Sequence, residues 1–380
     1  MSPVERLDAI IVGGGPAGST LARALVRVGM RVALLDKRVF PRDKTCAGCI
    51  TPTVVKTLAL DLDEYRHGRV LQPIHGFRLA GMGAPLVENR HGPKPASYGI
   101  RRFEFDHYLL ERCGAELHTG MAVGSLRREA GEWIVNESLR APLLAGAGGH
   151  FCPVARALGA DLGRGERVVG AQEFEVQLTP AQAACSGVRG DTPQFYFYPD
   201  LAGYAWIFRK GDWLNVGIGR KNPRRLSEHT EAFVTALARD GVLEPEVARS
   251  RPNGHAYLLY TQSARPLVAE GALLVGDAAG LAYPESGEGI RPAVESALLA
   301  GEAIAACRGD YSQRKLAAYA DAIEARYGAR RRAAPAADAP GALRRFAAAL
   351  LLRTHWFTRD VVTRRWFLRE HVAPLGSRGA

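Results

Sequence analysis

The chain has 380 residues, 47% of them apolar and 23% charged, which is enough to bury a full core spread over two joined domains. No apolar run approaches the roughly 20 residues of a membrane-spanning helix, and the first strand is expected too early for a signal peptide. The six scattered cysteines predict a reducing cytoplasm. Much of the net charge of +11 lies in residues 326–380, which hold twelve arginines and three acids. Because the rest is nearly neutral, we expect no nucleic-acid partner.

The first predicted elements form a βαβ unit. Residues 9–12 are a short continuous apolar run, as a buried parallel strand requires. A glycine-rich turn, a helix over about 19–28 and a second apolar strand over 31–35 follow. Near the other end of the chain, residues 271–275 predict another buried strand, which precedes a helix from about Gly289.

Two stretches between these elements have a different character. Residues 70–100 are rich in glycine, proline and histidine, whereas residues 168–262 alternate between polar and apolar side chains. A period of two is typical of antiparallel strands and predicts a second sheet. Pro335, Pro340 and the alanines between them predict a linker before the C-terminal tail.

The βαβ unit carries the pattern Gly13-x-Gly15-x-x-Gly18, and Asp36 stands at the end of its second strand. Gly13 makes the turn, Gly15 lets the backbone approach a pyrophosphate, and Gly18 allows the helix to pack closely on the strand. The helix N-terminus offers N–H groups and a positive dipole end to phosphates. Asp36 would accept hydrogen bonds from a ribose. A glycine turn without a ligand is the alternative, but strand, helix and acid together favour a dinucleotide.

A second glycine-rich segment decides between the possible dinucleotides. The strand at 271–275 ends in Gly276-Asp277, and Gly287 and Gly289 precede the following helix. FAD is long enough to need two strand ends, and Asp277 can accept hydrogen bonds from its ribityl hydroxyls. The following helix N-terminus could face the flavin edge on which negative charge develops upon reduction. No second Gly-x-Gly-x-x-Gly follows a strand, so the sequence predicts one tightly held FAD.

Two further stretches carry a resemblance to a known family. Residues 36–48 contain an acid, basic residues, Phe-Pro and a Lys-x-Cys-x-Gly run, and residues 204–210 read Tyr-x-Trp-x-Phe-Arg-Lys. Over residues 7–305 the chain resembles geranylgeranyl reductases, within a flavoprotein group that includes halogenases and hydroxybenzoate-hydroxylase-type monooxygenases. Arg209 replaces the proline usual in this family, and residues 146–149 lack the acid of its Gly-Ala-Asp-Gly turn.

The resemblance implies an α/β fold: a Rossmann-like FAD-binding domain (GR2-type), an interleaved antiparallel β-sheet substrate domain and a helical C-terminal tail. We expect the FAD-binding domain in 1–70, 101–165 and 266–330, the substrate domain in 71–100 and 166–265, and a basic extension in 331–380. It implies that Cys46 lies near the isoalloxazine and lines the substrate cavity with Tyr204 and Trp206, the candidates for catalysis. The FAD contacts expected from the motifs and the resemblance are Gly13, Gly15, Pro16, Ala17, Gly18, Asp36, Lys37, Cys46, Ala47, Arg102, Val123, Asp277, Gly287, Gly289 and Ile290.

Several residues admit two interpretations. Cys46 and Cys49 form a Cys-x-x-Cys pair, which is half of a zinc site and therefore predicts no metal, but either a redox disulfide or two ordinary thiols. Glu285 and Glu288 flank the helix start near the flavin, where helix capping is the favoured role. An aromatic set could wall an apolar tunnel or fill an inter-domain core; its members are Tyr196, Tyr198, Tyr204, Trp206 and Phe208.

The tail has apolar residues at helical spacing with arginines mostly off that stripe. Such a helix either lies on an anionic membrane or docks onto its parent domain with solvated arginines. The stripe comprises Leu343, Phe346, Leu350, Phe357, Val361 and Leu368. We therefore expect a cytoplasmic protein, with peripheral contact to the inner face of the membrane as the alternative to docking.

These features predict an FAD-dependent oxidoreductase that reduces carbon–carbon double bonds of a prenyl lipid or related hydrophobic substrate by hydride transfer from flavin N5. The electrons would come from NAD(P)H or a small electron carrier, because no second dinucleotide site is evident. One alternative is a monooxygenase or halogenase acting on an aromatic substrate, which shares the FAD scaffold. Another is a non-catalytic flavin-binding protein that associates with membranes.

Overall fold

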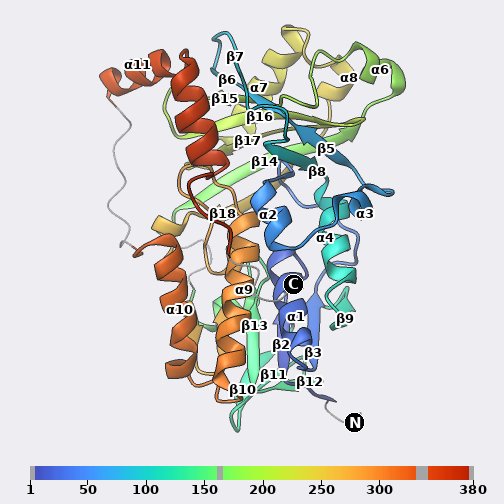
Figure 1. Ribbon diagram of the computed structural model, residues 1–380, viewed down its shortest axis with the longest axis vertical. Coiled ribbons are helices and arrows are strands. Elements are labelled where there is room, and N and C mark those ends of the chain that lie inside the picture. The colour runs from blue at the N-terminus through green and yellow to red at the C-terminus, as the bar shows by residue number, and fades with distance from the viewer. Residues whose placement is uncertain (1–4, 161–165, 331–340, 376–380) are drawn as a thin grey trace. The chain divides into compact units, whose positions relative to one another are not determined.

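The computed structural model describes residues 5–160, 166–330 and 341–375 (Figure 1). The expected linker at Pro335–Pro340 lies outside these described residues. The chain divides into two compact units, each built from three stretches. Unit 1 takes residues 1–42, 105–167 and 257–334, and unit 2 takes the intervening residues and the tail.

Unit 1 is built on a six-stranded sheet with the order β19-β20-β13-β2-β3-β9. Its strands pair in parallel except for the β19–β20 pair, which is antiparallel. The predicted apolar runs form its centre, where side chains such as Ile10, Leu34 and Leu144 are fully buried. The strands are β2 (Ala9–Val12), β3 (Val32–Asp36), β9 (Glu116–Thr119), β13 (Leu143–Gly146), β19 (Val268–Ala269) and β20 (Ala272–Leu274).

Helices α1 (Pro16–Arg27), α9 (Ile290–Cys307) and α10 (Gln313–Tyr327) belong to unit 1. Helix α1 packs against α9 at small residues, since a Cβ added at Gly301 would lie 2.9 Å from the Cβ of Ala24. In Figure 1, α9 and α10 run side by side. Unit 1 also contains α5 (Pro153–Ala157), most of α4 (Arg102–Glu111) and a small sheet of β1 (Glu5–Arg6), β10 (Leu126–Glu129), β11 (Glu132–Val135) and β12 (Leu139–Ala141).

Unit 2 contains a seven-stranded sheet with the order β18-β14-β17-β16-β15-β6-β7. The predicted alternating stretches form its centre and pair antiparallel, as expected. The hairpin β6–β7, from the glycine-rich stretch at 70–100, joins the same sheet. Its strand β6 pairs with β15 in parallel. The strands are β6 (Gly76–Gly81), β7 (Val87–Arg90), β14 (Val168–Gln177), β15 (Gln194–Phe197), β16 (Gly203–Lys210), β17 (Trp213–Arg220) and β18 (Asn253–Leu258).

The two faces of this sheet differ in chemistry. One face packs Phe174, Ile207 and Val216 into a core with α7 (Leu226–Arg239) and α8 (Pro245–Ala248). Because successive side chains point to opposite faces, the intervening residues lie on the other face. That second face, which we call the aromatic face, carries Glu173, Glu175, Phe195, Tyr204, Trp206, Phe208, Lys210 and Asn215.

Smaller elements complete unit 2. A three-stranded sheet joins β4 (Cys49–Ile50), β8 (Ser97–Ile100) and β5 (Leu71–Ile74). The short helices are α2 (Pro52–Thr57), α3 (Leu62–Arg66) and α6 (Pro180–Cys185). Among the helices within the described residues, none combines the length and the apolar character that crossing a membrane requires.

The tail contains helix α11 (Ala342–Leu351) and a π-helical segment over Phe357–Phe367, which we call the tail helix. The ring of Phe367 lies 4.6 Å from that of Phe195 and 5.3 Å from that of Tyr204, measured between centroids. Nδ2 of Asn89 donates a hydrogen bond of 2.8 Å to the hydroxyl of Thr358. The tail helix therefore packs on the aromatic face through Phe367 and Thr358, which are not members of the predicted stripe.

Candidate functional site

The glycine turn of unit 1 combines close packing with open space. A Cβ at Gly13 would overlap the carbonyl of Ala147, and one at Gly18 would overlap the carbonyl of Gly13. At Gly15, by contrast, the nearest atom to an added Cβ would be Nη2 of Arg42, at 3.6 Å. The N-cap residue of α1 is Gly15, which has no side chain to cap the helix, and Pro16 is the first residue of the helix. Backbone N–H groups and open space therefore coincide where a pyrophosphate would bind.

Asp36 shapes the same turn. One of its carboxylate oxygens accepts a hydrogen bond of 2.8 Å from the N–H of Gly14, and the other accepts one of 2.9 Å from the N–H of Arg38. The side chain is half-buried at the end of β3. The carboxylate is thus held beside the glycine turn, in the position from which an acid binds the ribose in this kind of fold.

Arg42 is a further candidate site residue, which the sequence did not single out. Its Nη1 lies 3.1 Å from the carboxylate of the fully buried Asp106, and its guanidinium lies 4.6 Å from the centre of the Phe40 ring. These contacts hold a cation beside Gly15, where a phosphate charge would be stabilised. The basic residues after Asp36 offer a weak sequence signal, but the partner Asp106 is far away in the chain.

The second glycine-rich segment also forms a compact arrangement within unit 1. Gly276 adopts a φ of +59° after β20, and its N–H donates a hydrogen bond of 3.0 Å to the hydroxyl of Ser296. A Cβ at Gly289 would lie 3.1 Å from Oδ1 of Asp277, so this carboxylate lies next to the start of α9. Gly287, with a φ of +68°, leaves room for the hydroxyl of Tyr257.

Glu288 caps α9, which confirms the favoured interpretation for this residue of the pair. Its Oε1 accepts a hydrogen bond of 2.7 Å from the N–H of Arg291. Burial raises the pKa of this carboxyl group to about 7, against the opposing effects of that hydrogen bond and of the charge of Arg291.

The structure places the remaining candidate FAD residues as follows. Ala17 and Ile290 are buried at the starts of α1 and α9, Lys37 is exposed after β3, and Val123 packs partly buried against the core of unit 1. Unit 2 holds the other three, all half-buried: Cys46 and Ala47 before β4, and Arg102 at the start of α4.

The Cys46 loop has a defined geometry within unit 2. The sulfur of Cys46 accepts a hydrogen bond of 3.4 Å from the N–H of Gly48. Both cysteines are free thiols, and Cys49 lies 2.8 Å from the hydroxyl of Ser97, which itself donates to the carbonyl of Ile50. Since that hydroxyl has used its proton, the thiol of Cys49 is the donor. Each of the two sulfurs therefore has its own hydrogen-bond partner.

Behind the loop, side chains of the aromatic face contact its backbone. Nδ2 of Asn215 donates to the carbonyl of Cys46 at 3.1 Å and to Oε2 of Glu173 at 2.7 Å. The indole N–H of Trp206 donates to Oδ1 of Asn215 at 2.7 Å.

An ion-pair cluster adjoins these contacts. Lys210 is fully buried, and its Nζ donates to Oε1 of Glu175 at 2.6 Å and to the carbonyl of Ile100 at 2.9 Å. Arg101 binds the other oxygen of Glu175 at 3.1 Å. Burial acts to raise the pKa of Glu175, but Lys210 and Arg101 outweigh it and hold the pKa below its usual value.

Glu173 behaves in the opposite way. Only 5% of this residue is exposed, and it has no ion-pair partner of its own in the part of the chain that is described. Burial, reinforced by the charge of Glu175, raises the pKa of Glu173 to about 8. The pKa values of these two neighbouring acids are therefore shifted in opposite directions.

The structure divides the aromatic set. Tyr204, Trp206 and Phe208 lie on the aromatic face, but Tyr196 pairs with Ala205 and therefore points the other way, where its ring lies 5.4 Å from that of Phe233. Tyr198 follows Tyr196, with its hydroxyl 3.4 Å from the carbonyl of His229 on α7. The expectation of one wall formed by all five rings is wrong, because the register of β15 against β16 separates them.

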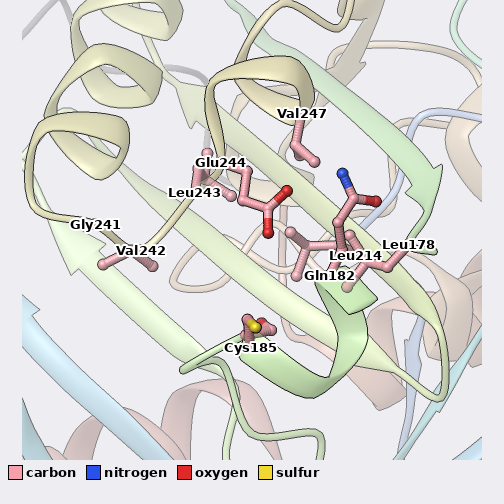
Figure 2. Close-up of a pocket in the computed structure, with 10 residues that line it drawn as sticks. Leu178, Gln182, Cys185, Leu214, Gly241, Val242, Leu243, Glu244 and Val247 are labelled. Carbon is pink, nitrogen blue, oxygen red and sulfur yellow. The ribbon is translucent and has the colours of Figure 1, made fainter. Parts of the chain in front are cut away.

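A small pocket opens on the α7–α8 side of the sheet, in view in Figure 2. Leu178, Gln182, Leu214, Glu244 and Val247 are among its lining residues. Leu214 points into the core of that side, so the pocket is separated from the aromatic face by the sheet itself. It does not correspond to the cavity expected beside Cys46.

Comparison with known proteins agrees with this arrangement. Residues 6–331 match the protein family described as FAD binding domain. The chain is 28% identical to menaquinone reductase of Mycobacterium tuberculosis, over 80% of this chain and 77% of that protein. It is 30% identical to digeranylgeranylglycerophospholipid reductase 2 of Methanothermobacter thermautotrophicus, over 79% of this chain and 78% of that protein.

A solved structure shows the same fold. The geranylgeranyl bacteriochlorophyll reductase-like protein of Thermoplasma acidophilum superimposes with a TM-score of 0.72 at 22% identity, covering 92% of this chain and 88% of that one. The expected combination of an FAD-binding α/β domain and a second sheet is thereby confirmed. The chain is an FAD-dependent oxidoreductase that belongs to the FAD binding domain family, in the geranylgeranyl reductase group.

Proposed function

We propose that this enzyme reduces isolated carbon–carbon double bonds in the prenyl chain of a lipid or a prenylquinone. The observation that carries the proposal is the aromatic face of unit 2, on which Tyr204 and Trp206 accompany the Cys46 loop. Relatives over most of the chain are named as reductases of a digeranylgeranyl lipid and of menaquinone. Apolar aromatic side chains suit a prenyl chain, which offers no polar group for recognition.

Unit 1 is proposed as the FAD-binding domain. Gly15, the N-terminus of α1 and Arg42 would bind the pyrophosphate, and Asp36 would bind the adenosine ribose. Asp277 would accept hydrogen bonds from the ribityl chain beside the start of α9. When bound and reduced, FAD supplies a hydride from N5.

Unit 2 is proposed as the substrate domain. Isolated alkenes accept hydride poorly, so the enzyme must hold the double bond in place and exclude water. Tyr204, Trp206 and Phe208 would provide the dry surface, and Cys46 would lie at its reactive end. The proton for the second alkene carbon would come from water or from a pocket acid. The electrons would come from transiently bound NAD(P)H or a small electron carrier.

We also propose that α11 makes peripheral contact with the inner face of the cytoplasmic membrane. Leu343 and Phe346 are exposed by 80% and 64%, and Arg344 and Arg345 lie beside them in sequence. Exposed apolar residues next to cations are typical of helices that lie on anionic bilayers. A membrane is also where a prenyl lipid or prenylquinone resides.

The proposal is tested anaerobically with the dithionite-reduced enzyme and geranylgeranyl lipids or a prenylquinone. Mass spectrometry should show gains of two hydrogens per reduced bond, and heat-inactivated enzyme provides the control. No gain with any prenyl substrate would contradict the proposal. Rapid oxygen-dependent turnover of an aromatic compound would instead support a monooxygenase or halogenase. A flavin that no reductant reaches in stopped-flow experiments would indicate a binding protein.

A further inference from the structure

We propose that Glu173, Asn215 and Trp206 form a hydrogen-bonded clamp that positions Cys46 for the reaction. Asn215 and Glu173 are positioning residues, because Asn215 contacts the backbone of Cys46 rather than its sulfur and Glu173 contacts Asn215. The catalytic consequence rests on the proposed function, whereas the positioning itself can be measured without any substrate.

The clamp binds the backbone carbonyl of Cys46. That carbonyl accepts a hydrogen bond of 3.1 Å from Nδ2 of Asn215, whose amide also donates to Oε2 of Glu173 at 2.7 Å. Asn215 and Glu173 lie on adjacent strands of one sheet, β17 and β14. The half-buried loop is thereby tied to the sheet at the residue that bears the thiol.

Trp206 determines the orientation of the Asn215 amide. An indole N–H can only donate, so the atom 2.7 Å away must be the amide oxygen. The amide NH2 group is then directed at two acceptors, the carbonyl of Cys46 and Oε2 of Glu173. If the amide turned over, the indole would face a donor and Cys46 would face an oxygen. The same tryptophan is a candidate substrate contact, so the clamp connects the aromatic face to the Cys46 loop.

The sheet register brings these side chains together because the residue between them, Gly217, has no side chain. Trp206, Gly217 and Glu173 form one cross-strand row on β16, β17 and β14. A Cβ at Gly217 would overlap the indole ring and lie 2.6 Å from the Cβ of Glu173. Glycine at this position therefore lets the indole cross the middle strand and reach Asn215 in the next row.

The neighbouring ion pair does not explain the clamp. Lys210 and Arg101 bind Glu175, and Lys210 also binds the carbonyl of Ile100. Within the described residues, Glu175 reaches the clamp only through a long hydrogen bond of 3.4 Å from Asn215. The ion pair stabilises β8 against the sheet, and Glu173 is left to bind Asn215.

Amide hydrogen exchange of the FAD-loaded enzyme tests the proposal directly. Asn215→Asp keeps the acceptor for Trp206 but removes the donor to Cys46. We expect exchange in residues 43–50 to accelerate by about ten-fold or more, with β14 and β17 changing by less than about two-fold. Glu173→Ala should have a similar effect, and Glu173→Gln should restore part of the protection through its remaining acceptor.

Two further variants keep the test decisive if Asn215→Asp folds poorly. Trp206→Phe keeps the ring and loses the N–H, and should accelerate exchange in 43–50 by about three-fold. Gln172→Ala, one residue along β14 on the opposite face, is the matched control and should leave 43–50 unchanged. Unchanged exchange in 43–50, or equal acceleration throughout the sheet, would overturn the proposal.

Kinetics then separate positioning from substrate binding. For Asn215→Asp we expect kcat with a prenyl substrate to fall by about ten-fold or more, while KM stays within about three-fold of the value for Gln172→Ala. A change confined to KM would contradict a role for the clamp in catalysis. If no variant and no wild-type enzyme reduces a prenyl lipid, the proposed function fails, and the exchange data still decide whether the clamp exists.

Discussion

The two units handle polar chemistry in contrasting ways. In unit 1, the turn around Gly15 offers backbone groups and the open space left by its glycines, with Asp36 and Arg42 at its border. In unit 2, the Cys46 loop is held by buried side chains that contact one another, with Glu173 and Asn215 at the centre. A backbone cradle suits a cofactor of constant shape, whereas a side-chain network can fix a single reactive residue.

The largest expected effect concerns the buried acid of unit 2. A carboxyl group with a pKa raised to about 8, against 4.5 ordinarily, binds more protons in the folded than in the unfolded state. Stability therefore falls as pH rises from about 4.5 to 8, by roughly 4 kcal/mol at 1.36 kcal/mol per unit. Glu173→Gln should remove this loss. Denaturant unfolding at pH 5 and pH 9 measures this. The free energy of unfolding of the variant, relative to that of the wild type, should be greater at pH 9 than at pH 5.

Other ionisable groups also make the stability of the protein depend on pH. Comparing the variant with the wild type controls for them. Glu175 has a lowered pKa, so its stabilisation is present above its ordinary pKa and is lost only towards acid. Glu288 has a pKa raised to about 7 and remains in both proteins, as do Lys210 and Arg101. Their contributions cancel in the difference between variant and wild type. Parallel pH profiles for the two proteins would show that Glu173 is not a buried neutral acid.

The next effect tests the backbone cradle of unit 1. Gly15→Ala places a methyl group in open space near Arg42, where the pyrophosphate is expected. FAD affinity should fall by about 100-fold, with little change in Tm, because the nearest described atom, Nη2 of Arg42, lies at an ordinary contact distance of 3.6 Å from the new group. Gly18→Ala should lower Tm as well, since its Cβ overlaps the carbonyl of Gly13. Flavin titration measures the FAD affinity, and thermal unfolding measures Tm. Equal losses of Tm in the two variants would contradict the distinction between open space at Gly15 and close packing at Gly18.

A smaller effect separates the two cysteines of unit 2. Cys46→Ala should lower kcat for alkene reduction by about ten-fold while FAD remains bound. Cys49→Ala should leave kcat unchanged and cost about 1 kcal/mol of stability, because it removes the hydrogen bond to Ser97. Steady-state kinetics and unfolding on the same preparations provide the comparison. A loss of kcat in Cys49→Ala would favour a redox pair instead.

The smallest expected effect concerns α11, which is part of neither the glycine turn of unit 1 nor the Cys46 loop of unit 2. Arg345→Gln should weaken binding to anionic vesicles by about five-fold, equivalent to roughly 1 kcal/mol. Vesicle co-sedimentation measures this effect, with neutral phosphatidylcholine vesicles as the control. Equal binding to both kinds of vesicle would argue against electrostatic contact.

The sequence predicted those features that depend on neighbours in the chain. The strand at 9–12, the turn at Gly13 and the acid at Asp36 follow one another within a single βαβ unit, and the structure shows them as expected. The capping role of Glu288 was predictable for the same reason, because its partner is three residues away.

Features that depend on packing were not predictable. Arg42 becomes a site residue only through Asp106, and the clamp joins three separate segments through Cys46, Glu173 and Asn215. Alternation showed that Tyr196 and Tyr204 lie on strands, but only the pairing of Tyr196 with Ala205 places them on opposite faces. The tail stripe likewise divides, since Leu343 is exposed whereas Leu368 is buried.

The contact of Phe367 with Phe195 and Tyr204 also has a consequence for protein synthesis. Strands β15 and β16 are synthesised before the tail helix, so the contacts of Phe367 cannot form while these strands emerge from the ribosome. Exposed aromatic surface on a nascent chain is prone to aggregation and attracts chaperones. Unit 2 can therefore reach its final packing only once residues as far as Phe367 have been made.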